Sequence, residues 1–160
     1  MTGRRDLAEM LNPLVQSLIA AELPVLEAHG VSMWGYVVLG ALDDGSIRTQ
    51  VALAEAIGAD KTRIIGTLDQ LQAAGLITRD PDPLDRRARI LAITGEGRAV
   101  RRAVRAEIQS NEEQLLARLP ETDRHGFLRT ADALYRMLRE ESGAKAPSDR
   151  WPVQRKNAAR

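Results

Sequence analysis

The chain has 160 residues, of which 44% are apolar and only 3% aromatic. Its core must therefore be built from aliphatic side chains, which suit helices better than stacked sheets. There is no cysteine, and the two histidines, His29 and His125, are far apart in the sequence. This excludes disulfides, zinc fingers and thiol chemistry, and it predicts neither a metal site nor a cofactor. The net charge of +1 does not by itself indicate a nucleic-acid partner.

No segment has the length and apolar character of a membrane span or a signal peptide, so the chain is expected to be soluble and cytoplasmic, with no membrane partner. Positive charge is concentrated near the end of the sequence. Residues 145–160 hold five basic residues and one acidic residue, a net charge of +4 that leaves −3 for the rest of the chain. Because this segment is small, polar and proline-bearing, residues 142–160 are predicted to form a basic, disordered tail. Such a tail either adds salt-sensitive DNA affinity or is inert.

Two helices are predicted in the first part of the chain. Asn12 has the character of a helix cap, with Pro13 at the first helical position and apolar residues following at helical spacing. Pro24 is expected to kink or break this helix. Ser32 is a second cap, which opens a helix that runs through Leu42.

A helix-turn-helix is predicted next. Residues 49–57 form a short helix, Gly58 and Asp60 belong to a turn, and a longer helix ends at Gly75. Asp60 is expected to cap this longer helix. At about 100° per residue, one face of the longer helix points inward and carries Ile64, Leu68 and Leu71.

The opposite face of the longer helix is small and polar, and it carries Thr62, Arg63, Gly66 and Gln70. Such a face can enter the major groove of DNA, where arginine reads guanine and glutamine reads adenine through paired hydrogen bonds. Lys61 and the exposed amides of the first turn suit a phosphate. The alternative is an ordinary solvated helix face.

Two short strands, residues 76–80 and 89–93, are predicted to form a hairpin with a polar loop. Arg86, Arg87 and Arg89 cluster at its far end, where only solvent or an anionic partner can meet them. A wing of this kind can place an arginine in the minor groove. Asp85 is expected to pair with Arg87 and to fix the shape of the loop.

Two longer helices complete the chain. Thr94 is predicted to cap a helix that includes Leu119 and is closed by Pro120. Residues 121–141 form the last helix, with an apolar face that carries Phe127, Leu128, Ala131, Leu134, Tyr135 and Leu138.

Four of these motifs resemble the MarR family of winged helix-turn-helix regulators. Residues 48–58 (RTQVALAEAIG) are similar to the family's first motif helix, and residues 68–77, with LDQL and AGLI, to the exit of its recognition helix. Residues 82–89 (DPLDRRAR) match its wing, and residues 91–97 (LAITGEG) match the lead into its long helix. The chain departs from the family at Ile65-Gly66, where a polar residue and an arginine are frequent, and at Pro24.

The resemblance implies a mostly α-helical (α+β) fold with a small hairpin wing. A winged helix-turn-helix domain over residues 43–97 would lie between dimerisation helices in residues 5–42 and 98–141. The apolar stripes of the first and last helices also favour a second copy as the burial partner, the alternative being a monomer that folds these helices on itself. A homodimer would read an inverted repeat in double-stranded DNA, with half-sites about one helical turn apart.

The resemblance also implies a small aromatic or anionic effector, which would release a repressor from its operator. The residues expected near the effector cleft are His29, Met33, Trp34 and Tyr36. The alternative for Trp34 and Tyr36 is an ordinary core or rim position. A basic stripe lies at helical spacing near the start of the long helix, either as a solvated face or close to phosphates or an effector; it consists of Arg98, Arg101, Arg102 and Arg105.

Two other functions are alternatives to DNA binding. A protein-interaction module can use the same fold without DNA. An enzyme that acts on a small molecule needs a nucleophile beside a base or a phosphate-binding loop, and the sequence contains neither motif. The chain is therefore expected not to be an enzyme.

Overall fold

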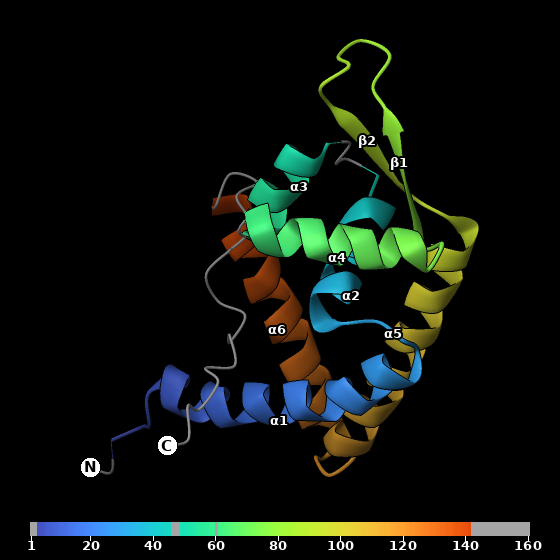
Figure 1. Cartoon of the computed structure of the whole chain (residues 1–160). Helices are drawn as coiled ribbons and strands as arrows, with labels where there is room; N and C mark the ends of the chain where they lie inside the picture. The colour runs from blue at the N-terminus through green and yellow to red at the C-terminus, as the bar shows by residue number, and fades with distance from the viewer. Residues whose placement is uncertain (1–2, 46–48, 60, 142–160) are drawn as a thin grey trace, which may run out of the picture.

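The computed structural model describes residues 3–45, 49–59 and 61–141. Within these ranges the chain forms six helices and one antiparallel hairpin, which confirms the mostly α-helical fold with a small wing (Figure 1). The elements are, in chain order, α1 (Leu7–Ala28), α2 (Met33–Asp43), α3 (Gln50–Ile57), α4 (Lys61–Ala73), β1 (Ile77–Pro81), β2 (Arg89–Ile93), α5 (Gly95–Leu116) and α6 (Glu121–Glu141). The predicted cap Asp60 and the predicted tail 142–160 lie outside the described residues.

Helix α1 begins well before the predicted start. Asp6 stands at the cap position with an extended backbone, and the helix continues from Leu7 through Pro13. The prediction that Asn12 caps the helix is therefore wrong. The apolar stripe already includes Leu7 and Leu11, and the helix accommodates the interior proline at the cost of one hydrogen bond and a steric clash with the carbonyl four residues earlier.

Pro24 does not end α1, so of the predicted kink or break the break is wrong. The two residues that follow it, Val25 and Leu26, are buried against Val104 and Ile108 of α5. This tertiary packing stabilises the helix beyond the proline, because most helical stability in proteins comes from burial of an apolar face.

Two predicted caps, Ser32 and Thr94, are confirmed, and Thr49, which was predicted as the first residue of its helix, is a third cap. Ser32, Thr49 and Thr94 each have an extended backbone, and each side-chain oxygen accepts a hydrogen bond from the backbone N–H three residues further on, at 3.0, 3.2 and 3.0 Å respectively. These bonds satisfy amide groups that a helix leaves unpaired in its first turn. The starts of α2, α3 and α5 are thus determined locally.

The hairpin pairs Ile77 with Ile93 at its base and Pro81 with Arg89 near its tip. It is shifted by one residue in its first strand relative to the prediction. Helix α5 also ends earlier than predicted, at Leu116, so that Leu119 lies in the turn before α6.

Two clusters of buried residues hold the fold together. The larger lies inside the winged helix-turn-helix and joins α2, α3 and α4 to the hairpin, whereas the smaller lies between α1 and α5. Tyr36 and Val100 pack against both clusters, so the winged module and the long helices form a continuous interior.

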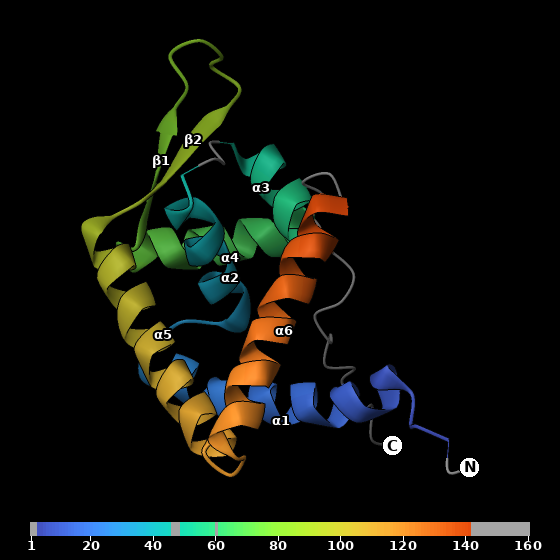
Figure 2. The ribbon, with the colours of Figure 1, turned by 180° about the vertical axis from the view of Figure 1, so that it is seen from behind.

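The wing and α1 lie at opposite ends of the molecule (Figure 1). Figure 2 shows α5 and α6 diverging from their connecting turn near α1, with α6 running toward α3. Along α1 and α6, large apolar side chains remain exposed, among them Leu11 (44%) and Leu134 (51%). In the described part of the chain no single helix passes as a membrane span; only α1 and α2 taken together, with an 84° bend between them, have the necessary length and composition.

Candidate nucleic-acid interface

Helix α4 presents its polar face to the outside, as predicted. Ile64, Leu68 and Leu71 are almost completely buried, which confirms the predicted inward face. Arg63, Gly66 and Gln70 are exposed on the other side of the helix. The side chains of the two remaining candidates on this helix, Lys61 and Thr62, lie outside the described part of the chain.

The turn before α4 depends on Gly58. This residue caps α3 in the left-handed conformation, with φ of 64°, which a side chain would disfavour. The backbone N–H of Ala59 then donates to the carbonyl of Ala54 at 3.1 Å. This tight turn brings α4 across α3, with Leu53 of α3 fully buried between the helices.

The loop of the wing is shaped by two aspartates. Asp82 Oδ1 accepts a hydrogen bond from the backbone N–H of Leu84 at 2.8 Å, and Asp85 Oδ1 accepts one from the backbone N–H of Arg87 at 2.9 Å. The sequence predicted that Asp85 pairs with the Arg87 side chain, but the bond is to the main chain. Such a turn is local and independent of the charge of Arg87.

The wing arginines are exposed, as the polarity of the loop predicted. Arg86 and Arg87 lie in the loop and Arg89 begins β2, and all three side chains are open to solvent. Because Asp85 binds the backbone of the loop, the guanidinium groups are not used to shape it. Three positive charges therefore stand at the end of a hairpin that projects beyond α3 and α4 (Figure 1).

The wing is joined to α4 by a contact that the sequence did not reveal. Arg79 of β1 donates to Asp69 Oδ1 and to Gln72 Oε1 of α4, each at 2.5 Å. Asp69 and Gln72 lie one helical turn apart, so both reach the same guanidinium group. The only sequence signal is an acidic and an amide residue at i, i+3 before a basic strand, and that pattern is too common to identify a brace.

Thr94 joins the base of the wing to the end of α4. Its hydroxyl group donates to the carbonyl oxygen of Gly75 at 2.7 Å and also accepts the capping bond of α5. The recognition helix, the hairpin and α5 are thus connected through one side chain.

Comparison with known proteins agrees with this geometry. Residues 29–88 match the family model described as MarR family. The transcriptional regulator HosA of Escherichia coli O111:H- is 32% identical over 93 residues, which cover 58% of this chain and 69% of HosA. The chain belongs to the MarR family.

Two solved structures show the same fold. The crystal structure of MarR matches with a TM-score of 0.75 at 23% identity, and the match covers 89% of this chain and 97% of the MarR chain. The transcriptional repressor CouR, bound to a 23-mer DNA duplex, matches with a TM-score of 0.68 at 24% identity, and the match covers 81% of this chain and 92% of the CouR chain. The protein is accordingly a winged-helix transcriptional regulator of the MarR family, a family whose regulators bind DNA.

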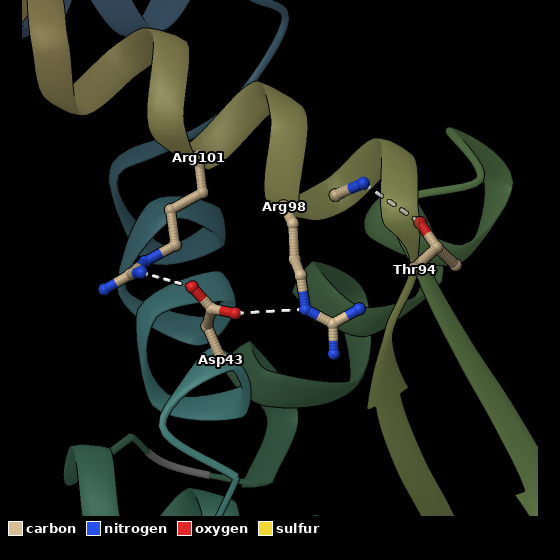
Figure 3. A network of polar contacts seen from close by, with 5 residues as sticks. Asp43, Thr94, Arg98 and Arg101 are labelled. Carbon is tan, nitrogen blue, oxygen red and sulfur yellow. Dashed lines mark hydrogen bonds and ion pairs between the residues drawn. The ribbon is translucent and has the colours of Figure 1, made fainter.

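In this MarR family protein, half of the basic stripe on α5 is used to hold α2. Figure 3 shows Asp43, the last residue of α2, between Arg98 and Arg101. Arg98 Nε donates to Asp43 Oδ1 at 3.2 Å, and Arg101 donates to Oδ2. A carboxylate at the C-terminal end of a helix is unfavourable beside the negative end of the helix dipole, and the two guanidinium groups offset this repulsion. Arg102 is exposed.

A cavity of about 350 Å³ lies between α1, α2 and α5. Two arginines, Arg101 and Arg105, and two glutamates, Glu22 and Glu112, line it. Its remaining lining residues are Met33, Tyr36, Val37, Gly40, Ile108 and Gln109. The expected effector residues Met33 and Tyr36 therefore share one cavity with half of the arginine stripe.

The two glutamates of this cavity have perturbed ionisation. Burial raises the pKa of the Glu22 carboxyl, and the neighbouring charge of Glu112 raises it further. Burial also raises the pKa of Glu112, and Glu113 adds to this effect. The pKa of the Tyr36 phenol is raised by burial, although Arg101 and Arg105 oppose that rise.

The other two expected effector residues lie elsewhere. Trp34 is stacked with Arg63 of α4, and His29 Nε2 contacts Glu107 Oε1 of α5 at 2.8 Å. Neither lines the cavity of about 350 Å³. Trp34 and Tyr36 are two residues apart in a helix, so their side chains point in directions about 200° apart and cannot face the same cavity.

A second, apolar cavity of about 410 Å³ lies where α1, α5 and α6 meet. It is lined mainly by leucines, with Phe127 of α6. The exposed apolar residues of α1 and α6 lie on two of the three helices that line this cavity.

Proposed function

We propose that this regulator binds an inverted-repeat operator as a homodimer and represses transcription until a small effector releases it. The observation that carries the proposal is the Arg79 brace, which joins an exposed polar helix to an arginine-tipped wing on one side of the molecule. A helix in the major groove and a wing in the adjacent minor groove need this fixed relationship. The proposed DNA contacts are Lys61, Thr62, Arg63, Gly66 and Gln70 of α4 and Arg86, Arg87 and Arg89 of the wing.

A second copy of the chain is the proposed partner of α1 and α6. Exposed Leu11 and Leu134, and the apolar cavity beside Phe127, would be buried in such a dimer. Removing apolar surface from water stabilises association roughly in proportion to its area. In this arrangement residues 5–42 and 98–141 form the dimerisation region, and residues 43–97 form the DNA-binding domain.

A dimer bound at a promoter represses transcription by blocking it, and this requires no surface that contacts the polymerase. The proposed effector site is the cavity lined by Tyr36, Arg101 and Arg105 together with Glu22 and Glu112. The arginines and the aromatic ring favour a small aromatic or anionic molecule, and the two carboxyl groups, whose pKa values are raised, oppose an anion only when they are ionised. A chromosomal target implies action in the cytoplasm, and the proposal assigns the chain no catalytic activity.

Enrichment of random duplexes on the purified protein tests this proposal. We expect an inverted repeat whose half-sites are about one helical turn, roughly 34–36 Å, apart. Replacement of Arg87 by Gln should remove most of the binding and lower the slope of log affinity against log salt concentration by about one. Arg129→Gln is the matched control, because it removes one positive charge from an exposed position of α6, outside α4 and the wing.

Three results would contradict the proposal. Binding that does not depend on salt would favour a protein-interaction module, and equal losses for the two variants would exclude the wing as a DNA contact. Turnover of a small molecule would favour an enzyme. Repression is tested separately by placing the enriched duplex at a promoter in a transcription assay, and effector release by adding small aromatic carboxylates to the complex.

A further inference from the structure

Trp34 of α2 contacts the recognition helix. The Cζ atom of Arg63 lies 5.5 Å from the centroid of the Trp34 ring. A guanidinium group over an indole at this distance is attracted by the negative face of the ring, and tryptophan provides the strongest such attraction. Trp34 is half-buried in the first turn of α2, and Arg63 is exposed in the first turn of α4.

Arg63 has a special position on α4. It is the only basic residue between positions 62 and 70, so it is the only cation of that stretch that can read a base. Gly66, one turn further on, offers no side chain. Base readout by this face therefore depends strongly on where the Arg63 side chain points.

We infer that Trp34 is a positioning residue that orients Arg63 for DNA readout and so sets the base preference of the operator. This inference rests on the proposed function, because Arg63 meets a base only if α4 enters the major groove. An arginine side chain has many rotamers, and fixing one of them in the free protein lowers the entropy lost on binding. The attraction to the ring uses the positive charge of the guanidinium group and does not itself occupy an N–H donor. Arginine reads guanine through paired N–H donors.

The test compares Trp34→Leu and Trp34→Phe with the wild type on the enriched duplex and on its single-base variants. We expect Trp34→Leu to weaken binding of the enriched duplex about ten-fold and to flatten the preference at one position of each half-site. Trp34→Phe should retain part of both, because phenylalanine also has a negative ring face. Affinity for random duplex and its salt dependence should not change. Trp151→Leu, which removes the only other tryptophan of the chain, is the matched control.

A double-mutant cycle separates positioning from general support of the fold. In an Arg63→Gln background, Trp34→Leu should have no further effect on base preference. An equal loss for every duplex, or the same loss in the Arg63→Gln background, would overturn the inference. If Trp34→Leu unfolds, the cycle is run with Trp34→Phe. The inference is then overturned if Trp34→Phe keeps the full base preference and Arg63→Gln does not change that preference. A wild-type protein with no sequence preference would instead overturn the proposed function, and this inference with it.

Discussion

Arg79 of β1 and Asp69 of α4 form an ion pair with an N···O distance of 2.5 Å, and this pair sets the direction of the wing relative to the recognition helix. The two residues come from consecutive elements that the turn at Gly75 connects. Without the pair, the hairpin would be attached to α4 mainly through its buried base.

The first prediction concerns this pair. Asp69→Asn should change the free energy of unfolding by less than about 1 kcal/mol, because the Asp69 side chain is 57% exposed and Gln72 still binds the guanidinium group of Arg79. It should still weaken operator binding, since the wing loses its fixed direction, and calorimetry together with a binding titration measures both quantities. Asp80→Asn on β1 removes the same charge from an exposed position and should bind more tightly than Asp69→Asn. Equal affinities would show that charge alone, rather than the brace, matters.

The second prediction concerns Asp43. Its side chain and that of Arg101 are only 22% and 19% exposed, so Asp43→Asn should leave a poorly solvated charge with weaker hydrogen bonds. We expect the free energy of unfolding to fall by about 1–3 kcal/mol, as measured by urea denaturation. Asp44→Asn changes the exposed neighbouring residue and should be nearly neutral. If both variants are neutral, the network does not hold α2 to α5.

The third prediction concerns Gly97, where α5 passes close to the base of the hairpin. An added Cβ would lie 2.1 Å from the carbonyl oxygen of Leu76, a backbone atom that cannot move away cheaply. Gly97→Ala should therefore destabilise the fold by at least about 1–3 kcal/mol in thermal unfolding. Gly95→Ala in the same helix has nothing within 4 Å of the added atom, and its melting temperature should equal or exceed that of the wild type. A neutral Gly97→Ala would contradict the close approach.

The fourth prediction tests the proposed dimer. Leu134→Glu places a charge among the exposed apolar residues of α6 and should shift the protein from dimer to monomer in light scattering. Operator affinity should fall with it, because two half-sites are no longer bound together. Arg129→Gln changes the net charge by the same amount, and Arg129 lies about 140° around the helix from Leu134. This variant should remain dimeric. A dimeric Leu134→Glu variant would exclude this stretch of α6 from the interface.

The fifth prediction is a dependence of stability on pH. The folded chain raises the pKa of Glu22 above its ordinary value of 4.5, so it binds this proton more tightly than the unfolded chain does. The contribution of Glu22 to stability should therefore decrease as the pH rises through the raised pKa, and the loss is complete above it. Glu22→Gln should flatten this part of the pH profile and increase stability at neutral pH. Glu27→Gln, at an exposed position of α1, should leave the profile as in the wild type.

Local chemistry in the sequence determined most of the elements. Ser32, Thr49 and Thr94 define helix starts because a cap needs only its own side chain and the amide three residues on. The inward face of α4 followed from periodicity alone, and the polar loop of the wing from its aspartates and arginines. These features involve neighbours in the chain, so one sequence is sufficient to predict them.

Only the tertiary structure decided the rest. Pro24 is tolerated because residues of α5, far along the chain, bury the turn that follows it. Arg79 binds Asp69 and Arg101 binds Asp43, and in both pairs the partners are too far apart in the sequence for a local pattern to predict the contact. Trp34 was expected beside Tyr36 in the effector cleft, but the packing of α2 turns it toward Arg63 instead. A side chain's partner depends on how whole helices pack, and that packing is the sum of many weak contacts between distant segments.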